Sequence, residues 1–446
     1  MRKEDNELLW RVGPETPMGQ VFRHYWTPIA LASQVDRPDS DPVRARFCGE
    51  NYVLFRDTEG KLGLFDELCP HRGASLALAR VEECGIRCIY HGWKFAVDGR
   101  LLDSPNHPNP AYRAKFRAQT YPCHEAGGLI WGYFGPRDTV PPLPDFAFLE
   151  APATHRNIER IDLHCNYLQL LEGGMDSSHV GILHSDQARP GWQRNSFTPN
   201  LDRLNPGALA VDDNAPTLSI ETTDFGFHYA AIRKAANGGQ SVRIVPFILP
   251  SARIIPAQAR IATIFEVPLD DENTSTYIIV HGNAPYARAH HRSLSGIGDP
   301  NLYSERDFKW RGTWQNRFGQ DRATMKERWG GFAGLEQEDA AVSLSMGPIF
   351  DRTREHLVPT DAAVVHTRRL LLSLAHAVTA GKAPPRLPAL ALISGAADTE
   401  LAPGAAWQDL VPHHGARRDD LLAAAVEWPE NDGDSIDRVR PGIGGE

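Results

Sequence analysis

Two short loops between residues 69 and 91 constrain the fold of this chain more than any other feature. The first reads C-P-H, with Cys69 and His71, and the second reads C-I-Y-H, with Cys88 and His91. A zinc finger usually groups its cysteines in one knuckle and its histidines in another. Here each loop offers one cysteine and one histidine, so two cysteines can hold one iron of a 2Fe–2S cluster while two histidines hold the other.

This alternation predicts a Rieske-type 2Fe–2S cluster, with a structural zinc site as the alternative. Neutral imidazoles in place of two anionic thiolates make such a cluster easier to reduce than one with four thiolates. His71 and His91 would also keep a ring N–H that can donate a hydrogen bond outward. We therefore expect the cluster to accept electrons from a low-potential donor and to pass them on.

A second group of ionisable residues lies in the stretch E-G-G-M-D-S-S-H-V-G-I-L-H, from Glu172 to His184. If this stretch is helical up to Gly181, then Glu172, Asp176 and His179 fall on one helix face. Gly181 would let the backbone bend before His184. Two histidines and a carboxylate from elsewhere form the facial triad of non-heme Fe(II) oxygenases. The sequence thus predicts a second metal site.

The missing carboxylate is expected downstream, in the run L-E-Q-E-D-A-A-V-S-L that begins at Leu335. Asp339 is followed by apolar residues, so it should open a helix that faces inward. A buried carboxylate needs a partner or a metal, because an unpaired buried charge is costly. Glu336 and Glu338 compete for this role. A further alternative is that all three acids have no ligand role and only stabilise the helix N-terminus, where acidic side chains are favoured.

Composition argues against several classes of protein. The chain has 446 residues and a formal net charge of −9 without a basic block, so we expect no nucleic-acid partner. It has no run of about 18 apolar residues and no apolar core at its N-terminus, so we expect no membrane association and a cytoplasmic location. Six cysteines are too few for a disulfide scaffold at this length, so we expect thiols or metal ligands.

A proline-rich run, P-R-D-T-V-P-P-L-P at Pro136–Pro144, is the strongest domain boundary in the chain. The length favours two domains. The predicted division is a helical packing segment at 1–42, a Rieske 2Fe–2S domain at 43–145, a mononuclear-iron catalytic domain at 146–385 and a C-terminal extension at 386–446.

Residue patterns predict antiparallel sheets on both sides of this boundary. The run 43–56, a D-T-E-G turn and the run 62–65 predict an antiparallel hairpin. A closing strand is predicted before the boundary, at Leu129–Phe134. Beyond the boundary we expect an antiparallel sheet curved around one helix. Its predicted strands are Arg156–Leu163, Thr217–Thr222, Gly226–Arg233, Val242–Leu249, Arg260–Val267 and Ser275–His281. The predicted helices are Asn6–Val12, Cys165–Gly173 and 361–379.

Five phrases between about residue 10 and residue 375 carry a family resemblance. They are R-V-G-P-E-T-P-M-G, D-E-L-C-P-H-R-G-A-S-L, R-C-I-Y-H-G-W-K-F-A-V-D-G, C-N-Y-L-Q-L-L-E-G-G-M-D-S-S-H and S-M-G-P-I-F-D-R-T-R-E-H-L. With them the chain resembles the oxygenase (alpha) component of a Rieske non-heme iron ring-hydroxylating oxygenase, in the phthalate dioxygenase-like group. The resemblance implies an α+β protein. Its N-terminal Rieske domain is all-β, and its catalytic domain is a helix-grip, an antiparallel sheet around a long helix.

The resemblance also implies roles for individual residues. The metal ligands would be Cys69, His71, Cys88 and His91 for the cluster, and His179, His184 and Asp339 for the mononuclear Fe(II). Asp176 would join an iron-ligand histidine to a Rieske histidine of the neighbouring subunit. A ring-shaped homo-oligomer, either a trimer or a dimer of trimers, would then be part of the mechanism. Glu172 is left without an assigned role, and the alternatives are that it tunes this bridge or that it pairs with a nearby basic residue.

The implied function is the cis-dihydroxylation of a phthalate-like aromatic carboxylate with O2 and electrons from NADH. The electrons would come from a partner reductase that carries flavin and a plant-type 2Fe–2S cluster. One alternative is a Rieske monooxygenase that removes O- or N-methyl groups from a substituted aromatic acid. A more distant alternative is a Rieske electron-transfer protein without catalytic activity.

An aromatic acid needs an arginine, whose planar fork matches a carboxylate. Arg243 is the leading candidate, because apolar Val242 and Ile244 flank it within a predicted central strand. Arg233 and Arg253 are further candidates. For each of the three, the alternative is an outward or interface arginine.

Overall fold

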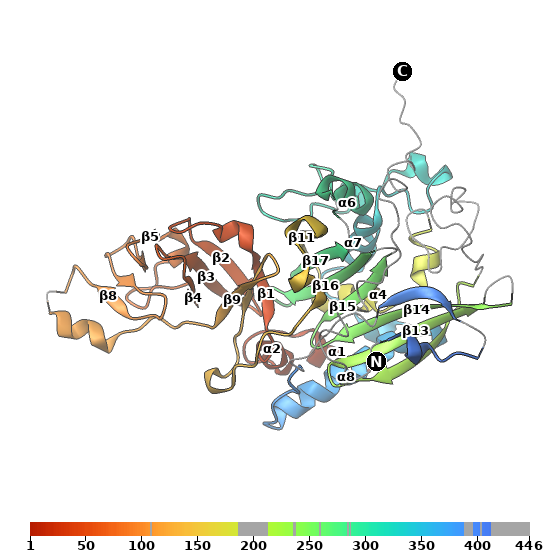
Figure 1. Cartoon of the computed structure of the whole chain (residues 1–446), viewed down its shortest axis with the longest axis horizontal. Coiled ribbons are helices and arrows are strands. Elements are labelled where there is room, and N and C mark those ends of the chain that lie inside the picture. Colours follow the sequence, from red (N-terminus) through yellow and green to blue (C-terminus); the bar gives the residue numbers. More distant parts are fainter. Residues whose placement is uncertain are drawn as a thin grey trace, which may run out of the picture.

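The structure is a computed structural model with two parts, a smaller β-rich part and a larger part of sheet and helices, arranged end to end (Figure 1). It describes residues 1–107, 109–185, 213–234, 238–257, 260–282, 285, 287–387, 396–401 and 404–411. The segment 186–212 and the residues after 411 therefore lie outside the described part, including most of the predicted C-terminal extension.

The smaller part is built from three antiparallel sheets of short strands. The first has the order β1–β10–β9, with β1 at Thr27–Leu31, β9 at Cys123–Ala126 and β10 at Leu129–Gly132. The second consists of β2 (Val43–Phe47), β3 (Glu50–Arg56) and β4 (Leu62–Asp66). The third consists of β5 (Arg80–Glu82), β6 (Gly85–Arg87), β7 (Lys94–Phe95) and β8 (Leu101–Asp103).

The run 43–56, expected to be one arm of a hairpin, is two strands. Cys48 and Gly49 have φ angles of 47° and 83°, so the chain reverses there and Phe47 pairs with Glu50. The hairpin becomes a three-stranded meander. The sequence signal was the C-G pair, because glycine adopts positive φ at little cost.

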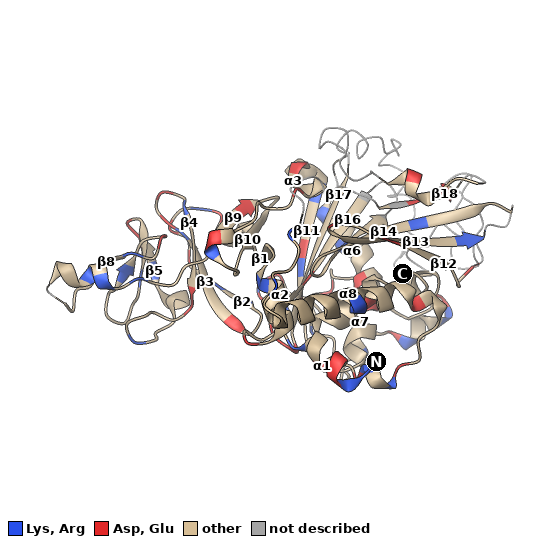
Figure 2. Ribbon diagram, turned by 90° about the horizontal axis from the view of Figure 1, so that it is seen from below, with Lys and Arg blue, Asp and Glu red and all other residues tan. Residues whose placement is uncertain are grey.

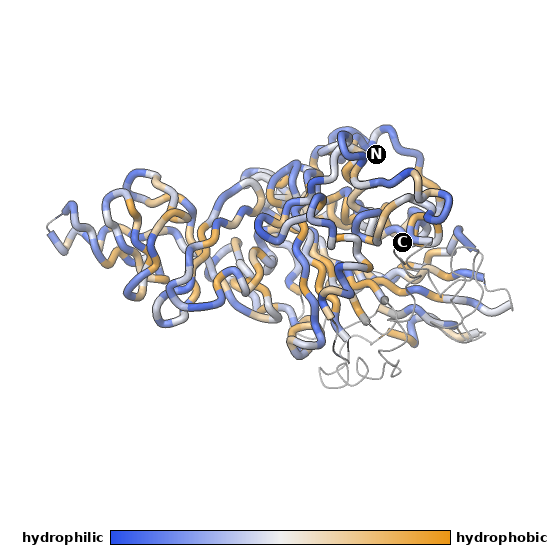
Figure 3. Tube along the Cα trace, turned by 90° about the horizontal axis from the view of Figure 1, so that it is seen from above, coloured by the Kyte–Doolittle hydropathy of each residue, from blue (hydrophilic) through white to orange (hydrophobic). Residues whose placement is uncertain are grey.

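One large antiparallel sheet forms the core of the second part, in the order β11–β17–β16–β15–β14–β13–β12. Its strands are β11 (Arg156–Leu163), β12 (Thr217–Thr222), β13 (Gly226–Lys234), β14 (Gln240–Ile248), β15 (Ala252–Ala257), β16 (Arg260–Pro268), β17 (Thr274–Gly282) and β18 (Ala397–Leu401). The first half of β14 pairs with β18 and its last two residues pair with β15, so the sheet divides along this strand. Hydrophobic residues line its strands, whereas the outer loops are hydrophilic (Figure 3).

Helices cover this sheet. The helices are α1 (Lys3–Trp10), α2 (Pro17–Arg23), α3 (Ala147–Glu150), α4 (Tyr167–Gly174), α6 (Arg288–Ser295), α7 (Leu335–Ser345) and α8 (Ala362–Thr379). Helix α4 begins at the N-cap Asn166, whose side chain accepts the Leu168 N–H at 3.1 Å. It lies against β16 and α7, and its first five residues are buried. Helices α1 and α2 lie against α8, so the N-terminal segment packs on the second, larger part.

The expected helix up to Gly181 is wrong, because α4 ends at Gly174. The Asp176 carboxylate accepts the Ser178 N–H at 2.7 Å and the His179 N–H at 3.3 Å, which replaces helical hydrogen bonds by a turn. A Cβ on Gly174 would lie 1.8 Å from Nε of Arg253, so any larger residue at this helix end would have to displace the Arg253 side chain. Asp176 and His179 therefore follow the helix rather than share its face.

The two parts meet through backbone hydrogen bonds and aromatic packing. The Cys48 N–H donates to Pro268 O at 2.9 Å and the Gly49 N–H donates to Leu269 O at 2.8 Å, so the β2–β3 turn docks on the β16–β17 turn. Trp131 of β10 packs edge-on against Phe265 of β16, with ring centroids 5.4 Å apart. Basic and acidic residues are spread along both parts (Figure 2). Within the described ranges, no helix is long and apolar enough to cross a membrane.

Candidate metal centres

The two cysteine–histidine loops have matching backbones. In each loop the N–H of the cysteine donates to the carbonyl five residues later, at 2.9 Å for Cys69 and 2.8 Å for Cys88. The carbonyl of each cysteine accepts the N–H of a glycine four residues later. These glycines, Gly73 and Gly92, have φ angles of 75° and 76°, a region that glycine enters without strain. The sequence spacing therefore builds two equivalent loops that face each other.

The four predicted cluster ligands come together as two pairs. The buried thiols of Cys69 and Cys88 are in contact, and burial together with Cys88 raises the pKa of Cys69 to about 11. The rings of His71 and His91 lie edge to face with centroids 4.6 Å apart. The His91 Nδ1 atom is buried without a hydrogen-bond partner. A sulfur pair, an imidazole pair and an unsatisfied ring nitrogen fit a Rieske cluster, whose irons would favour the thiolates.

Trp93 is a neighbour that the sequence reasoning missed. Its ring stacks on His71 with centroids 4.6 Å apart and planes 12° apart, and its Nε1 atom donates to Asn106 Oδ1 at 2.9 Å. Trp93 therefore fixes the plane of the His71 ring. The signal in the sequence was the phrase H-G-W, which runs from His91 to Trp93.

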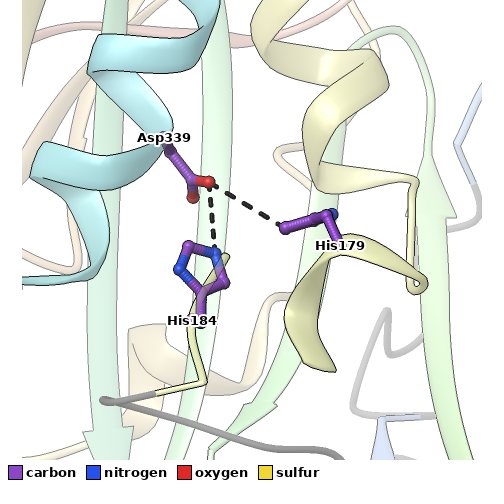
Figure 4. A group of neighbouring side chains, drawn as sticks. All are labelled: His179, His184 and Asp339. Atoms are coloured by element: carbon purple, nitrogen blue, oxygen red, sulfur yellow. Dashed lines mark ion pairs between the residues drawn. The ribbon is translucent and has the colours of Figure 1, made fainter. Parts of the chain in front are cut away.

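The second site joins the loop after α4 to helix α7. The ligand atoms of His179, His184 and Asp339 all lie within 4.8 Å of one another (Figure 4). The Asp339 Oδ1 atom is 3.2 Å from Nε2 of His184 and 3.9 Å from Nε2 of His179. Two imidazole nitrogens and one carboxylate oxygen that converge in this way fit the facial arrangement of a non-heme iron.

A second carboxylate lies behind each of these histidines. Asp176 Oδ2 is 3.1 Å from Nδ1 of His179, and Glu338 Oε2 is 2.7 Å from Nδ1 of His184. In both rings Nδ1 faces the outer acid and Nε2 faces Asp339. Histidines that bind metals usually donate their other ring N–H to a carboxylate or carbonyl, as these two rings are placed to do.

Charge at this site favours a cation. Burial would raise the pKa of Asp339, but His184 and His179 outweigh it and lower that pKa to about 2. Burial would lower the pKa of His184, but Asp339 and Glu338 outweigh it and raise that pKa to about 10. The carboxylates thus stabilise positive charge between them, and a divalent iron would take that place.

The two acids of α7 differ from the expected arrangement. The helix begins at Leu335, so Glu338 lies in its first turn, Asp339 follows directly, and neither acid opens the helix. The side chain of Glu338 is 1% exposed, whereas that of Asp339 is 50% exposed. The fully buried acid is therefore the one that contacts Nδ1 of His184. Glu336 is not part of the three-residue group.

The three candidate arginines have different partners. Arg243 Nη1 lies 2.8 Å from Asp398 Oδ2, and Arg253 Nη1 lies 2.7 Å from Glu266 Oε1. The Arg253 pair is buried and the Arg243 pair is largely buried. Arg233 instead donates to the backbone carbonyl of Ser177, next to Asp176.

Glu172 belongs to a buried ion-pair network. Its Oε1 atom accepts from Nε of Arg352 at 2.8 Å and from Nε of Arg368 at 2.6 Å, and Arg368 also pairs with Glu355. Arg352 further donates to Asn6 of α1. The network ties α4 to α1 and α8. Sequence reasoning missed these arginines because nothing in the local pattern predicts which distant acid they meet.

Two family models cover most of the chain. The model described as the Rieske 2Fe–2S domain matches residues 25–122, and the model described as LigXa C-terminal domain like matches residues 132–415. The first match ends and the second begins close to the proline-rich run. The four domain limits given above stay a prediction.

Curated relatives match along most of their length. The chain is 38% identical over 392 residues to the phthalate 4,5-dioxygenase oxygenase subunit of Pseudomonas putida, covering 85% of this chain and 87% of that protein. It is 35% identical over 407 residues to the 3-chlorobenzoate-3,4-dioxygenase oxygenase subunit of Comamonas testosteroni, covering 86% and 90%. It is 30% identical over 388 residues to the 5,5'-dehydrodivanillate O-demethylase oxygenase subunit of a Sphingobium species, covering 85% and 82%.

Solved structures share the fold. Dicamba monooxygenase bound to dicamba matches with a TM-score of 0.54 and 18% identity, covering 80% of this chain and 98% of that one. The terminal oxygenase of carbazole 1,9a-dioxygenase from Novosphingobium sp. KA1 matches with a TM-score of 0.53 and 20% identity, covering 83% and 96%. The chain belongs to the Rieske non-heme iron oxygenases, as an oxygenase component of the phthalate dioxygenase-like group, whose cofactors are a Rieske 2Fe–2S cluster and a mononuclear iron.

Proposed function

We propose that this chain is the oxygenase component of a two-component aromatic ring-hydroxylating dioxygenase. Its substrate is a phthalate-like aromatic carboxylate, which it converts to a cis-dihydrodiol with O2 and electrons from NADH. A separate reductase that carries flavin and a plant-type 2Fe–2S cluster delivers the electrons. The observation that carries the choice of an acid substrate is the environment of Arg233.

Arg233 lies on β13 and is 1% exposed. Its Nη2 atom donates to Ser177 O at 2.6 Å and its Nε atom donates to Asp213 O at 3.1 Å, whereas Nη1 has no hydrogen-bond partner. Burial and the charge of Arg243 lower the pKa of Arg233 to about 10. Among the residues described, no carboxylate forms an ion pair with it. A buried guanidinium in this state favours an anion, and a substrate carboxylate supplies one.

This environment changes the ranking of the three candidate arginines. Arg243 and Arg253 each have a carboxylate from the chain itself, so a substrate would have to compete with Asp398 or Glu266. Within the described part of the chain, the hydrogen-bond partners of Arg233 are carbonyl and hydroxyl oxygens. We therefore place Arg233 ahead of Arg243 as the residue that binds the substrate carboxylate.

The proposed ligands of the two metal centres are those of the predicted sets. The cluster would be held by Cys69, His71, Cys88 and His91, and the mononuclear iron by His179, His184 and Asp339. When bound, the cluster supplies single electrons and the mononuclear iron supplies the site of dioxygen activation. The chain's own residues bind the substrate, orient the ligand rings and exclude water from the site.

Asp176 is the proposed bridge between neighbouring subunits. Its Oδ2 atom contacts Nδ1 of His179, and its side chain is 21% exposed. A partly exposed carboxylate can accept a further N–H from a Rieske histidine of a neighbouring copy. We therefore propose a ring-shaped homo-oligomer, either a trimer or a dimer of trimers.

A Rieske monooxygenase that demethylates a substituted aromatic acid is the second candidate. The same two metal centres support it, and the relative named as an O-demethylase oxygenase subunit is 30% identical over most of this chain. A pure electron-transfer protein is a third and weaker candidate. It gives no reason for a second ligand group at His179, His184 and Asp339.

The deciding experiment combines the holoprotein with a flavin-containing reductase, NADH and a panel of aromatic acids and methoxy-aromatics. A dioxygenase forms a cis-dihydrodiol that carries both atoms of 18O2. Release of formaldehyde would instead establish the demethylase. NADH oxidation that proceeds without any product, and without change in His179→Ala, would leave only the electron-transfer role.

A further inference from the structure

His184 lies between two carboxylates of the same helix. Its Nε2 atom is 3.2 Å from Asp339 Oδ1, and its Nδ1 atom is 2.7 Å from Glu338 Oε2. Asp339 and Glu338 are consecutive in α7, and their side chains reach opposite edges of one imidazole ring. The helix therefore contacts both nitrogens of this ring.

Of the two acids, Glu338 is the buried one, and so is the histidine that it contacts. The side chain of Glu338 is 1% exposed and that of His184 is 6% exposed. Desolvating a carboxylate is costly unless a charged or hydrogen-bonding partner compensates for it. Leu170 of α4 and Ala341 of α7 belong to a buried apolar cluster, to which residues of both helices contribute. The contact between Glu338 and Nδ1 of His184 is thus an interior hydrogen bond.

The geometry determines which nitrogen of His184 is available. A carboxylate only accepts, so Nδ1 must carry the proton in this hydrogen bond. The Nε2 atom faces Asp339 and His179, so a metal that replaces the Nε2 proton there would meet the lone pair of this atom. A ring that is free to rotate or to change tautomer would present this lone pair only part of the time.

We propose that Glu338 is a positioning residue that holds His184 as the Nδ1–H tautomer and aims its Nε2 atom at the mononuclear iron. This inference rests on the proposed iron site. It assigns different roles to two acids of the E-Q-E-D run: Asp339 binds the metal, and Glu338 binds the ligand histidine. It also pairs Glu338 with Asp176, because each carboxylate contacts Nδ1 of one of the two histidines.

Metal affinity tests the proposal without relying on turnover. Holoprotein with an intact cluster is freed of its mononuclear iron and titrated with Co2+ against a chelator. Glu338→Ala should weaken Co2+ binding by about 10–100-fold, the usual effect of removing such a partner. Glu338→Gln should weaken it less, because the amide oxygen still accepts from Nδ1–H. The matched control is Glu336→Ala, which removes an acid of the same helix outside the ligand group.

The EPR spectrum of the bound Co2+ gives a second readout, since the oxidised cluster is silent. It should change in Glu338→Ala, return toward wild type in Glu338→Gln and stay unaltered in Glu336→Ala. Wild-type affinity and spectrum in both Glu338 variants would overturn the proposal. An equal loss in Glu336→Ala would also overturn it, by assigning the effect to the helix as a whole. If Glu338→Ala does not fold, Glu338→Gln decides.

One further variant separates this inference from the proposed function. His184→Ala should abolish tight Co2+ binding. If His184→Ala still binds Co2+ tightly, the assignment of the iron site itself is refuted. If His184→Ala loses tight binding while the Glu338 variants bind as wild type does, only the positioning role of Glu338 is refuted.

Discussion

The Oδ2 atom of Asp176 lies 3.1 Å from Nδ1 of His179, on the ring edge opposite the Nε2 atom that faces Asp339. The other oxygen of Asp176 accepts the N–H and the hydroxyl of Ser178, at 2.7 and 2.9 Å. Its own loop therefore fixes this carboxylate in place. It can be altered without removing a proposed metal ligand.

Asp176→Asn should keep both metal centres and lose most turnover. The amide has the shape of the carboxylate but not its charge, so the contact with His179 and the proposed bridge are weakened. We expect product formation to fall by about 10–100-fold, as for other partners of metal-binding histidines. Iron content and product yield in a single turnover, starting from the reduced cluster, measure the two effects separately. Ser178→Ala is the control and should retain most activity. Near-normal turnover of Asp176→Asn would show that the bridge is wrongly assigned.

Asp339→Asn should release the mononuclear iron, because a neutral amide is a much weaker ligand than a carboxylate. The two irons of the cluster should stay, since their proposed ligands lie in the other part of the protein. Iron analysis together with the visible spectrum of the cluster measures both. Glu336→Gln is the control and should keep all iron. The third ligand would be misassigned if Glu336→Gln lost this iron and Asp339→Asn retained it.

The strands were largely predictable, since their alternation reflects burial of one face. Arg156–Leu163 and Thr217–Thr222 have the expected limits, and β11 alternates between buried and half-buried residues along its length. Strand β15 was missed, because Pro256 and a nearby turn break its pattern. Strand β18 was also missed. Its A-D-T-E-L sequence has little β propensity, and it depends on pairing with β14.

The candidate site was predictable where a ligand type and a spacing were enough. The cysteine–histidine loops and the pair His179 and His184 needed only local spacing. The partners of Arg243 and Glu172 come from segments 155 to 196 residues away. No local pattern encodes such pairs. The roles of Glu338 and Asp339 also depended on where α7 begins, because one residue turns a side chain by about 100° around a helix.

Arg233→Gln should raise KM for an aromatic acid by about 10–100-fold, since a lost charged hydrogen bond is worth about 1.5–3 kcal/mol. The same variant should affect a neutral amide of that acid much less. This comparison separates carboxylate binding from the contact between Arg233 and Ser177, which both substrates would lose equally. Arg243→Gln is the matched control, because its partner is Asp398. An equal rise in KM for the acid and the amide would contradict the carboxylate role.

Glu172→Gln should destabilise the protein by about 3–5 kcal/mol, because it leaves buried guanidinium groups without their carboxylate. The pKa of Glu172 is lowered despite burial, because Arg352 and Arg368 favour the ionised form. The midpoint of urea unfolding, followed by tryptophan fluorescence, measures the change. Asp98→Asn breaks an exposed pair with Arg100 and should move the midpoint little. Equal midpoints in the two variants would refute the structural role of Glu172.

His281 should make the protein less stable in mild acid. Its ring is buried on β17, its Nδ1 atom has no hydrogen-bond partner, and burial together with the charge of Arg156 lowers its pKa to about 4. An unfolded histidine has a pKa of about 6.5, so between these values the unfolded chain binds a proton that the folded chain does not. Stability therefore falls as the pH drops from about 6.5 to 4, by up to about 1.4 kcal/mol per pH unit.

The measurement is the melting temperature of wild type and His281→Leu at a series of pH values with iron content held constant. The variant should lose less stability than wild type below about pH 6.5. Above that pH the two curves should run parallel, because His281 is then neutral in both the folded and the unfolded state. His124→Leu, at an exposed position on β9, is the control and should follow the wild-type profile. Parallel curves for all three proteins down to pH 4 would mean that His281 takes up its proton in the folded state as readily as in the unfolded one, and that Arg156 and the surrounding apolar side chains do not exclude the charge.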